Sequence, residues 1–128
     1  MEVVIIEDDK ETREYISLVL KTAWPNVDID STSFGGEGID LVKEKSPQIV
    51  ILDLGLPDIN GFIVLQRLRS FSKVPVLVLT INGIPQSKAK SLSLGADCYM
   101  NKPFEANELI VQIEQILKKT ENNSGIAY

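Results

Sequence analysis

Polar side chains suited to ion and phosphate chemistry follow the apolar runs of this 128-residue chain. The apolar runs are residues 3–6, 49–52, 76–79 and, more weakly, 97–100. The residues that come directly or shortly after them are Glu7, Asp8, Asp9, Asp53, Thr80 and Lys102. If the runs are parallel strands, their carboxyl ends meet at one edge of a sheet, where ligands bind in open α/β proteins. The sequence therefore predicts that these acids, the hydroxyl and the amine form one site.

The residue types of this predicted site favour phosphoryl transfer at a magnesium ion. Carboxylates gathered at one edge repel one another and raise each other's pKa unless a cation neutralises them. Mg²⁺ suits a few carboxylates, water and a phosphate oxygen, and a bound metal favours the ionised form that a nucleophilic carboxylate needs. Lys102 and Thr80 can each contact a phosphoryl oxygen and stabilise the charge that develops during transfer.

Strand and helix patterns alternate along the chain, as in an α/β protein with a parallel sheet. The runs 3–6, 49–52 and 76–79 are continuous and mostly β-branched, which is typical of central strands buried on both faces. Residues 27–31 and 97–100 are weaker strands. Apolar spacing predicts helices over 16–23, 38–44, 62–68, 86–94 and 109–117, with Pro25 ending the first and Gly95 the fourth. Five strands and five helices result.

Length, charge and composition exclude several classes of function. The length allows one domain, and a net charge of −5 argues against direct nucleic-acid binding. With no histidine and one cysteine, Cys98, the chain lacks the usual ligands of zinc and haem, the base of a Ser-His-Asp triad and an internal disulfide. No run approaches the roughly 20 apolar residues of a membrane span. The N-terminus lacks the basic segment of a signal peptide, so we expect a cytoplasmic protein.

Four segments together resemble the receiver domain of bacterial response regulators, the switch of two-component systems, over residues 1–119. They are Val-Val-Ile-Ile-Glu-Asp-Asp at 3–9, Ile-Leu-Asp-Leu-Gly-Leu-Pro-Asp-Ile-Asn-Gly at 51–61, Val-Leu-Thr at 78–80 and Gly-Ala-Asp-Cys-Tyr-Met-Asn-Lys-Pro-Phe at 95–104. Each is weak alone, but the combination at these strand ends is specific. The resemblance implies a CheY-like, flavodoxin-like three-layer fold with strand order 2-1-3-4-5. Residues 120–128 are then a flexible tail or the start of a linker to an output domain.

The resemblance also implies roles for the residues of the site. Asp53 corresponds to the phosphoacceptor, which takes a phosphoryl group from a sensor histidine kinase. Thr80 and Lys102 correspond to the residues that contact the phosphoryl group. The implied Mg²⁺ ligands are Glu7, Asp8, Asp53 and the backbone carbonyl of Gly55. Such a domain catalyses only its own phosphorylation and dephosphorylation and is not an enzyme with a separate substrate.

Three consecutive acids stand where the family pattern uses two. Four apolar residues precede Glu7, and Arg13 occupies a position that is often basic in the family, which favours Glu7 and Asp8 as the acidic pair. Asp9 would then cap the first helix, where its carboxylate accepts free backbone N–H groups. An exchange of these roles stays open.

The resemblance further implies a route from the site to the surface. Tyr99 matches an aromatic position whose side chain turns inward when Thr80 moves toward the phosphoryl group, which reshapes the face of the fourth helix, fifth strand and last helix. An alternative is that Tyr99 simply packs at the sheet edge with its hydroxyl in water. The bond between Lys102 and Pro103 is a candidate for the cis isomer.

Within the family, the chain resembles most the winged-helix DNA-binding (OmpR/PhoB-like) class, whose members control transcription. That class often forms homodimers through the fourth helix, fifth strand and last helix with ion pairs between subunits. Lys88 and Asp97 fit that scheme. Glu114, near a usual arginine, and Cys98, at a common aspartate, depart from it. Dimerisation through this face stays open.

The residue after Thr80 also departs from the family pattern. A small residue is usual there because the phosphoryl group and the attacking water pass close to it, but this chain has Ile81. We therefore hypothesise slow phosphorylation by small donors and slow hydrolysis.

Three other functions compete with the switch. A phosphatase of the haloacid dehalogenase type needs a second aspartate two residues after the nucleophile, where this chain has Gly55. A flavodoxin needs a phosphate-binding loop after the first strand, where three acids would repel a flavin phosphate. A scaffold that is never phosphorylated remains a third reading, favoured only by Ile81.

Overall fold

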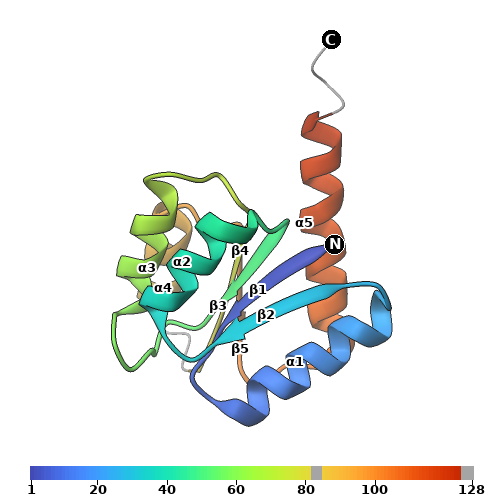
Figure 1. Ribbon diagram of the computed structural model, residues 1–128. Coiled ribbons are helices and arrows are strands. Elements are labelled where there is room, and N and C mark those ends of the chain that lie inside the picture. The colour runs from blue at the N-terminus through green and yellow to red at the C-terminus, as the bar shows by residue number, and fades with distance from the viewer. Residues whose placement is uncertain (82–84, 125–128) are drawn as a thin grey trace.

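The computed structural model describes residues 1–81 and 85–124, the last three of them by their backbone alone. The chain alternates between strand and helix throughout (Figure 1). The elements are β1 (Glu2–Ile6), α1 (Lys10–Ala23), β2 (Asp28–Thr32), α2 (Gly35–Lys45), β3 (Ile49–Leu52), α3 (Gly61–Arg69), β4 (Val76–Thr80), α4 (Pro85–Ser93), β5 (Cys98–Asn101) and α5 (Ala106–Ser124). All strand pairs are parallel, in the order β2-β1-β3-β4-β5. The predicted fold is confirmed.

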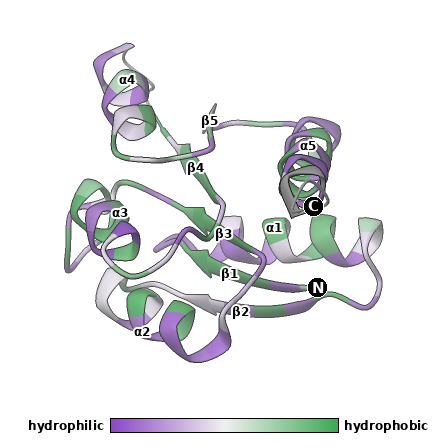
Figure 2. Ribbon diagram, turned by 90° about the horizontal axis from the view of Figure 1, so that it is seen from above, coloured by the Kyte–Doolittle hydropathy of each residue, from purple (hydrophilic) through white to green (hydrophobic). Residues whose placement is uncertain are grey.

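The sheet is the middle of three layers, with α1 and α5 on one face and α2, α3 and α4 on the other (Figure 2). Successive side chains of a strand point to opposite faces. Val3 and Ile5 accordingly pack under α1 and α5, whereas Val4 and Ile6 pack against α2 and α3. This is why the central strands are apolar at every position and do not alternate with polar residues. None of the helices in the described part of the chain is long and apolar enough to cross a bilayer.

The carboxyl ends of the strands are held in register beyond their last residues. The amide of Asp53 donates to the carbonyl of Ile6 at 2.9 Å, and the amide of Glu7 donates to Thr32 at 2.9 Å. The amide of Lys102 donates to the carbonyl of Thr80 at the same distance. These bonds continue the ladder of the sheet, so the same kind of bond that joins the strands also holds the backbones of Glu7, Asp53 and Lys102.

Four helix boundaries differ from the predicted ranges by three residues or more, and two of these are the starts of α1 at Lys10 and of α5 at Ala106. The second helix begins at Gly35 and not at residue 38, because Asp58 binds its first amides from a different loop. The last helix continues to Ser124, so it includes residues 120–124 of the predicted tail or linker. Lys118 to Ser124 include no glycine or proline that would end a helix, and the first one follows at Gly125. Residues 125–128 lie outside the described part of the chain.

Asp58 joins the loop after β3 to the start of α2. Its Oδ1 accepts from the Gly35 amide at 2.8 Å and its Oδ2 from the Gly36 amide at 3.0 Å. Phe34, the residue at the N-cap position of α2, makes no side-chain hydrogen bond to the helix. The carboxylate thus satisfies two free amides of a helix that begins more than 20 residues earlier. The loop that follows Asp53 is anchored by the same contact.

The cap at Asp58 should make stability depend on pH. Hydrogen bonds from the Gly36 and Gly35 amides lower the pKa of Asp58 below its ordinary value. Its stabilising effect is therefore complete above the unfolded-state pKa of about 3.9 and is lost as the pH falls through the lower folded-state pKa. We expect Asp58→Asn to lower the midpoint of urea unfolding at pH 7, and the difference from the unmodified chain to shrink toward about pH 3.

Asp40→Asn, at an exposed position of the same helix, is the control and should leave the midpoint nearly unchanged at both pH values. A gap between the Asp58→Asn variant and the unmodified chain that stays constant with pH would contradict the role of Asp58 as a charged cap.

Candidate functional site

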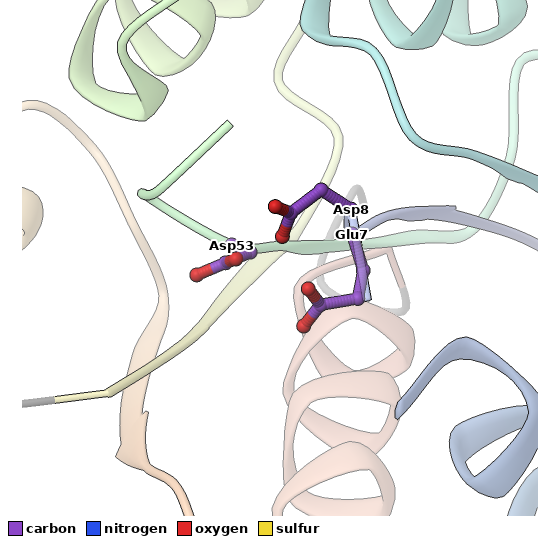
Figure 3. Close-up of side chains that lie close together, drawn as sticks. All are labelled: Glu7, Asp8 and Asp53. Atoms are coloured by element: carbon purple, nitrogen blue, oxygen red, sulfur yellow. The ribbon is translucent and has the colours of Figure 1, made fainter. Parts of the chain in front are cut away.

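Three carboxylates converge at the carboxyl edge of the sheet. Glu7 and Asp8 follow β1, Asp53 follows β3, and Figure 3 shows the three side chains close together. Each offers an oxygen within 4.8 Å of the others. Glu7 is 2% exposed and Asp53 7% exposed, whereas Asp8 faces solvent. Two buried carboxylates and one exposed carboxylate at this spacing are suited to a hard divalent cation that keeps some of its waters.

Lys102 supplies the cationic side of the site from the segment after β5. Its ammonium forms a short ion pair with Glu7 Oε1 and lies 3.7 Å from Asp53 Oδ2. Burial raises the pKa of Glu7 to about 7, against the lowering effect of the Lys102 hydrogen bond. The position of Lys102 was predicted from the sequence, but its contact with Glu7 was not. The ammonium is thus held beside both buried acids.

The loop around Asp53 is closed by a glycine. The Gly61 amide donates to the Leu54 carbonyl at 3.0 Å. A Cβ at position 61 would lie 2.4 Å from the Leu54 Cα and 2.8 Å from the Asp53 carbonyl oxygen, so only glycine fits this close approach. The Gly55 amide also donates to Asp53 Oδ1 at 3.3 Å. The proposed role of the Gly55 carbonyl as a metal ligand stays a prediction.

Asp9 acts as the predicted cap of α1. Its Oδ2 accepts from the Thr12 amide at 3.0 Å and from the Thr12 hydroxyl at 2.5 Å. These two bonds, the hydroxyl first, lower the pKa of Asp9. The Asp9 amide in turn donates to Glu7 Oε2 at 3.0 Å. With the Asp9 carboxylate engaged at the helix, the carboxylate that joins Glu7 and Asp53 is that of Asp8.

The two predicted switch residues, Thr80 and Tyr99, lie on β4 and β5. Thr80 ends β4 and is 7% exposed, and its hydroxyl has only a long contact of 3.4 Å to the Ile81 carbonyl. The ring of Tyr99 packs against the core on the α2 and α3 side of the sheet. Its hydroxyl is buried and has no hydrogen-bond partner among the described residues. The alternative of a Tyr99 hydroxyl in water is therefore wrong, and the switch role stays a prediction.

A cavity of about 450 Å³ opens beside the site, between the start of α1 and the segment after β5. Tyr15 and Phe104 contact each other at its wall, with ring centroids 5.6 Å apart and the rings tilted by 43°, and Lys102 and Ile81 also line it. Ile81 is 63% exposed. The bond between Lys102 and Pro103, at the same wall, is cis as expected.

Comparison with known proteins decides which family this geometry belongs to. A family model described as "Response regulator receiver domain" matches residues 3–114. The chain is a response regulator receiver domain. The receiver domain is also 42% identical over 125 residues to the cell cycle response regulator CtrA of Brucella ovis, covering 97% of this chain and 53% of CtrA. It thus spans about half the length of the curated relatives that it matches.

Solved structures agree with this family. The receiver domain matches the CheY-like response regulator receiver domain protein of Methanospirillum hungatei with a TM-score of 0.88 at 21% identity, over 95% of this chain and 97% of the other. It matches the receiver domain of the Francisella response regulator 1452 with a TM-score of 0.81 at 27% identity, over 93% and 98%. Receiver domains act as phosphorylation-dependent switches of two-component signalling and interact with histidine kinases.

The face formed by α4, β5 and α5 carries the residues that the sequence linked to dimers. Asp97 is already bonded within the receiver domain, because its Oδ2 lies 3.3 Å from the Arg69 guanidinium and accepts from the Val76 amide at 2.8 Å. The Cys98 thiol is half-buried and donates to Gln112 at 3.2 Å. Lys88 and Glu114 are exposed.

Sequence reasoning missed three contacts in and next to the site. The first is the ion pair of Lys102 with Glu7, and the second is the cap that Asp58 provides for α2. The third is made by Arg13, whose guanidinium donates to the Glu7 and Asp8 carbonyls. The distance of Arg13 along the sequence from Glu7 and Asp8 indicated that it could lie near them. Its hydrogen bonds, however, depend on the path of the chain between the acidic loop and α1.

Proposed function

We propose that this receiver domain takes a phosphoryl group on Asp53 from a sensor histidine kinase in the presence of Mg²⁺. The observation that carries the proposal is the convergence of three carboxylates with a lysine ammonium next to Asp53. An Asp53 oxygen would attack phosphorus, and the new P–O bond would form as the P–N bond to the donor histidine breaks. The imidazole leaves with the bonding electron pair.

The chain's own residues would assist this transfer in separate ways. Mg²⁺ held by Glu7, Asp8 and Asp53 would neutralise the carboxylates and the charge on phosphoryl oxygens. The ammonium of Lys102, which is paired with Glu7, would bind one phosphoryl oxygen. Thr80, at the end of the neighbouring strand, would move to bind another.

The chemistry proposed here stops at the protein's own phosphorylation and dephosphorylation. A phosphatase of the haloacid dehalogenase type would need an aspartate two residues after the nucleophile, as the acid and base for turnover. That position is Gly55, whose amide donates to Asp53. The receiver domain therefore supports a switch and not an enzyme with a separate substrate.

The output proposed is a rearrangement of the α4, β5 and α5 face. The buried residue of α4 is Ser91, whose hydroxyl has no hydrogen-bond partner in the described part of the chain. A helix anchored by an unpaired hydroxyl is easier to displace than one anchored by a leucine. Inward movement of Thr80, followed by Tyr99, would shift the population of this face toward a second state.

This face would pass the signal to partners outside the chain. We propose that it controls transcription through an output domain, as the length of the relatives suggests, and that the receiver domain itself does not bind DNA. A homodimer through α4, β5 and α5 would use Lys88, whereas Asp97 would have to share its bond with Arg69. We place the protein in the cytoplasm, where the Cys98 thiol would stay reduced.

The proposal is tested by the intact mass of the protein after incubation with acetyl phosphate and Mg²⁺. We expect a gain of a single phosphoryl group, lost when Mg²⁺ is chelated beforehand. Asp53→Asn should gain none, because an amide is not a nucleophile for phosphorus at neutral pH. An equal gain in Asp53→Asn, or none in the unmodified chain with either acetyl phosphate or a phosphorylated kinase, would overturn the proposal.

The side chain of Ile81 lines the cavity next to Lys102. We expect Ile81→Ala to speed phosphorylation by acetyl phosphate and hydrolysis of the product by roughly 3- to 10-fold, or about 0.7 to 1.4 kcal/mol of barrier. Time courses of phosphorylated protein give both rates. Leu18→Ala is the matched control, because Leu18 is 64% exposed on α1 but does not line the cavity. Unchanged rates in Ile81→Ala would remove the steric role.

A further inference from the structure

The backbone of the acidic loop is clamped by Arg13, which lies one turn into α1. The Nη1 of Arg13 donates to the Glu7 carbonyl at 2.8 Å and to the Asp8 carbonyl at 3.1 Å. The same nitrogen donates to the Ser33 hydroxyl, in the loop after β2, at 2.8 Å. A single half-buried guanidinium therefore ties the two acidic residues to each other and to a neighbouring loop.

Glu7 and Asp8 are held in place by different means. Glu7 is buried, and its carboxylate is fixed by Lys102 and by the Asp9 amide. Asp8 is exposed, so packing does not fix its side chain, and its direction depends on the backbone that carries it. The peptide unit is planar, so a bond to the Glu7 carbonyl also fixes the amide of Asp8, and the bond to the Asp8 carbonyl fixes its other side.

We infer that Arg13 is a positioning residue for the divalent cation: it holds the Asp8 carboxylate toward Glu7 and Asp53 without touching the ion. The inference rests on the proposed function, because it concerns the same Mg²⁺ site. Outer residues that orient metal ligands typically change metal affinity or activity by 10- to 100-fold when removed. Arg13 acts on one exposed ligand, so the effect should lie at the lower end of that range.

The test is an Mg²⁺ titration of the folded protein, followed by backbone amide chemical shifts. Arg13→Ala should raise the dissociation constant for Mg²⁺ by about tenfold. Phosphorylation by acetyl phosphate should slow at low Mg²⁺ and return to within about twofold of the unmodified rate at saturating Mg²⁺. A variant that was only less stable would not recover its phosphorylation rate at saturating Mg²⁺.

Arg69→Ala is the matched control. Arg69 also clamps a loop through backbone carbonyls, donating to Gly95 at 2.7 Å, but it lies on α3 and contacts none of the three acids of the site. Its removal should lower the unfolding midpoint and leave the Mg²⁺ dissociation constant within about twofold of the unmodified value. If Arg13→Ala does not fold, Arg13→Gln, which keeps a long side chain with one donor group, is held to the same criterion.

Two results would overturn the inference. One is a folded Arg13 variant with an unchanged Mg²⁺ dissociation constant. The other is an equal increase in Arg69→Ala, which would indicate a general loss of rigidity. Failure of the unmodified protein to bind Mg²⁺ or to be phosphorylated would instead overturn the proposed function, so the two failures are distinguishable.

Discussion

The repulsion among three carboxylates held within 4.8 Å is the constraint on which the rest of this receiver domain depends. Such a group is unfavourable unless neighbouring groups oppose the repulsion, and two of its members are also removed from water. The chain opposes it with the ammonium of Lys102, whose side chain is 11% exposed, and with hydrogen bonds that hold the backbone after the strands. Glu7 and Asp53 are each held by a backbone hydrogen bond that continues the sheet. The fold thus keeps the acids together where a flexible loop would let them separate.

The apolar side chains on both faces of the sheet help to hold the acids together. A strand buried on both faces cannot slip or twist without exposing one row of its side chains. The core on both faces therefore fixes the ends of β1 and β3 relative to each other. Glu7 and Asp53, which follow these strands, are fixed relative to each other as a result. By contrast, the buried residue of α4 is a serine, so this helix has less apolar anchoring than the central strands.

The sequence was sufficient to predict the features that depend on the strands and on the residues that directly follow them. The buried apolar runs predict the central strands, and the residues after them predict that Asp53 lies near Glu7 and Lys102. The order of the strands follows from the family resemblance. What it could not predict depends on contacts between distant segments. Asp58 extends α2 to Gly35, a position with poor helix propensity, only because two loops meet. The clamp by Arg13 likewise depends on the path of a loop.

The central claim is that Asp53 itself carries the phosphoryl group. Borohydride reduces an acyl phosphate of aspartate to homoserine, so reduction followed by peptide mass mapping identifies the modified residue chemically. After incubation with acetyl phosphate and Mg²⁺, the account predicts homoserine at position 53, and none without Mg²⁺. Homoserine at Asp8 or Asp9, or phosphorylated protein with Asp53 unreduced, would contradict it.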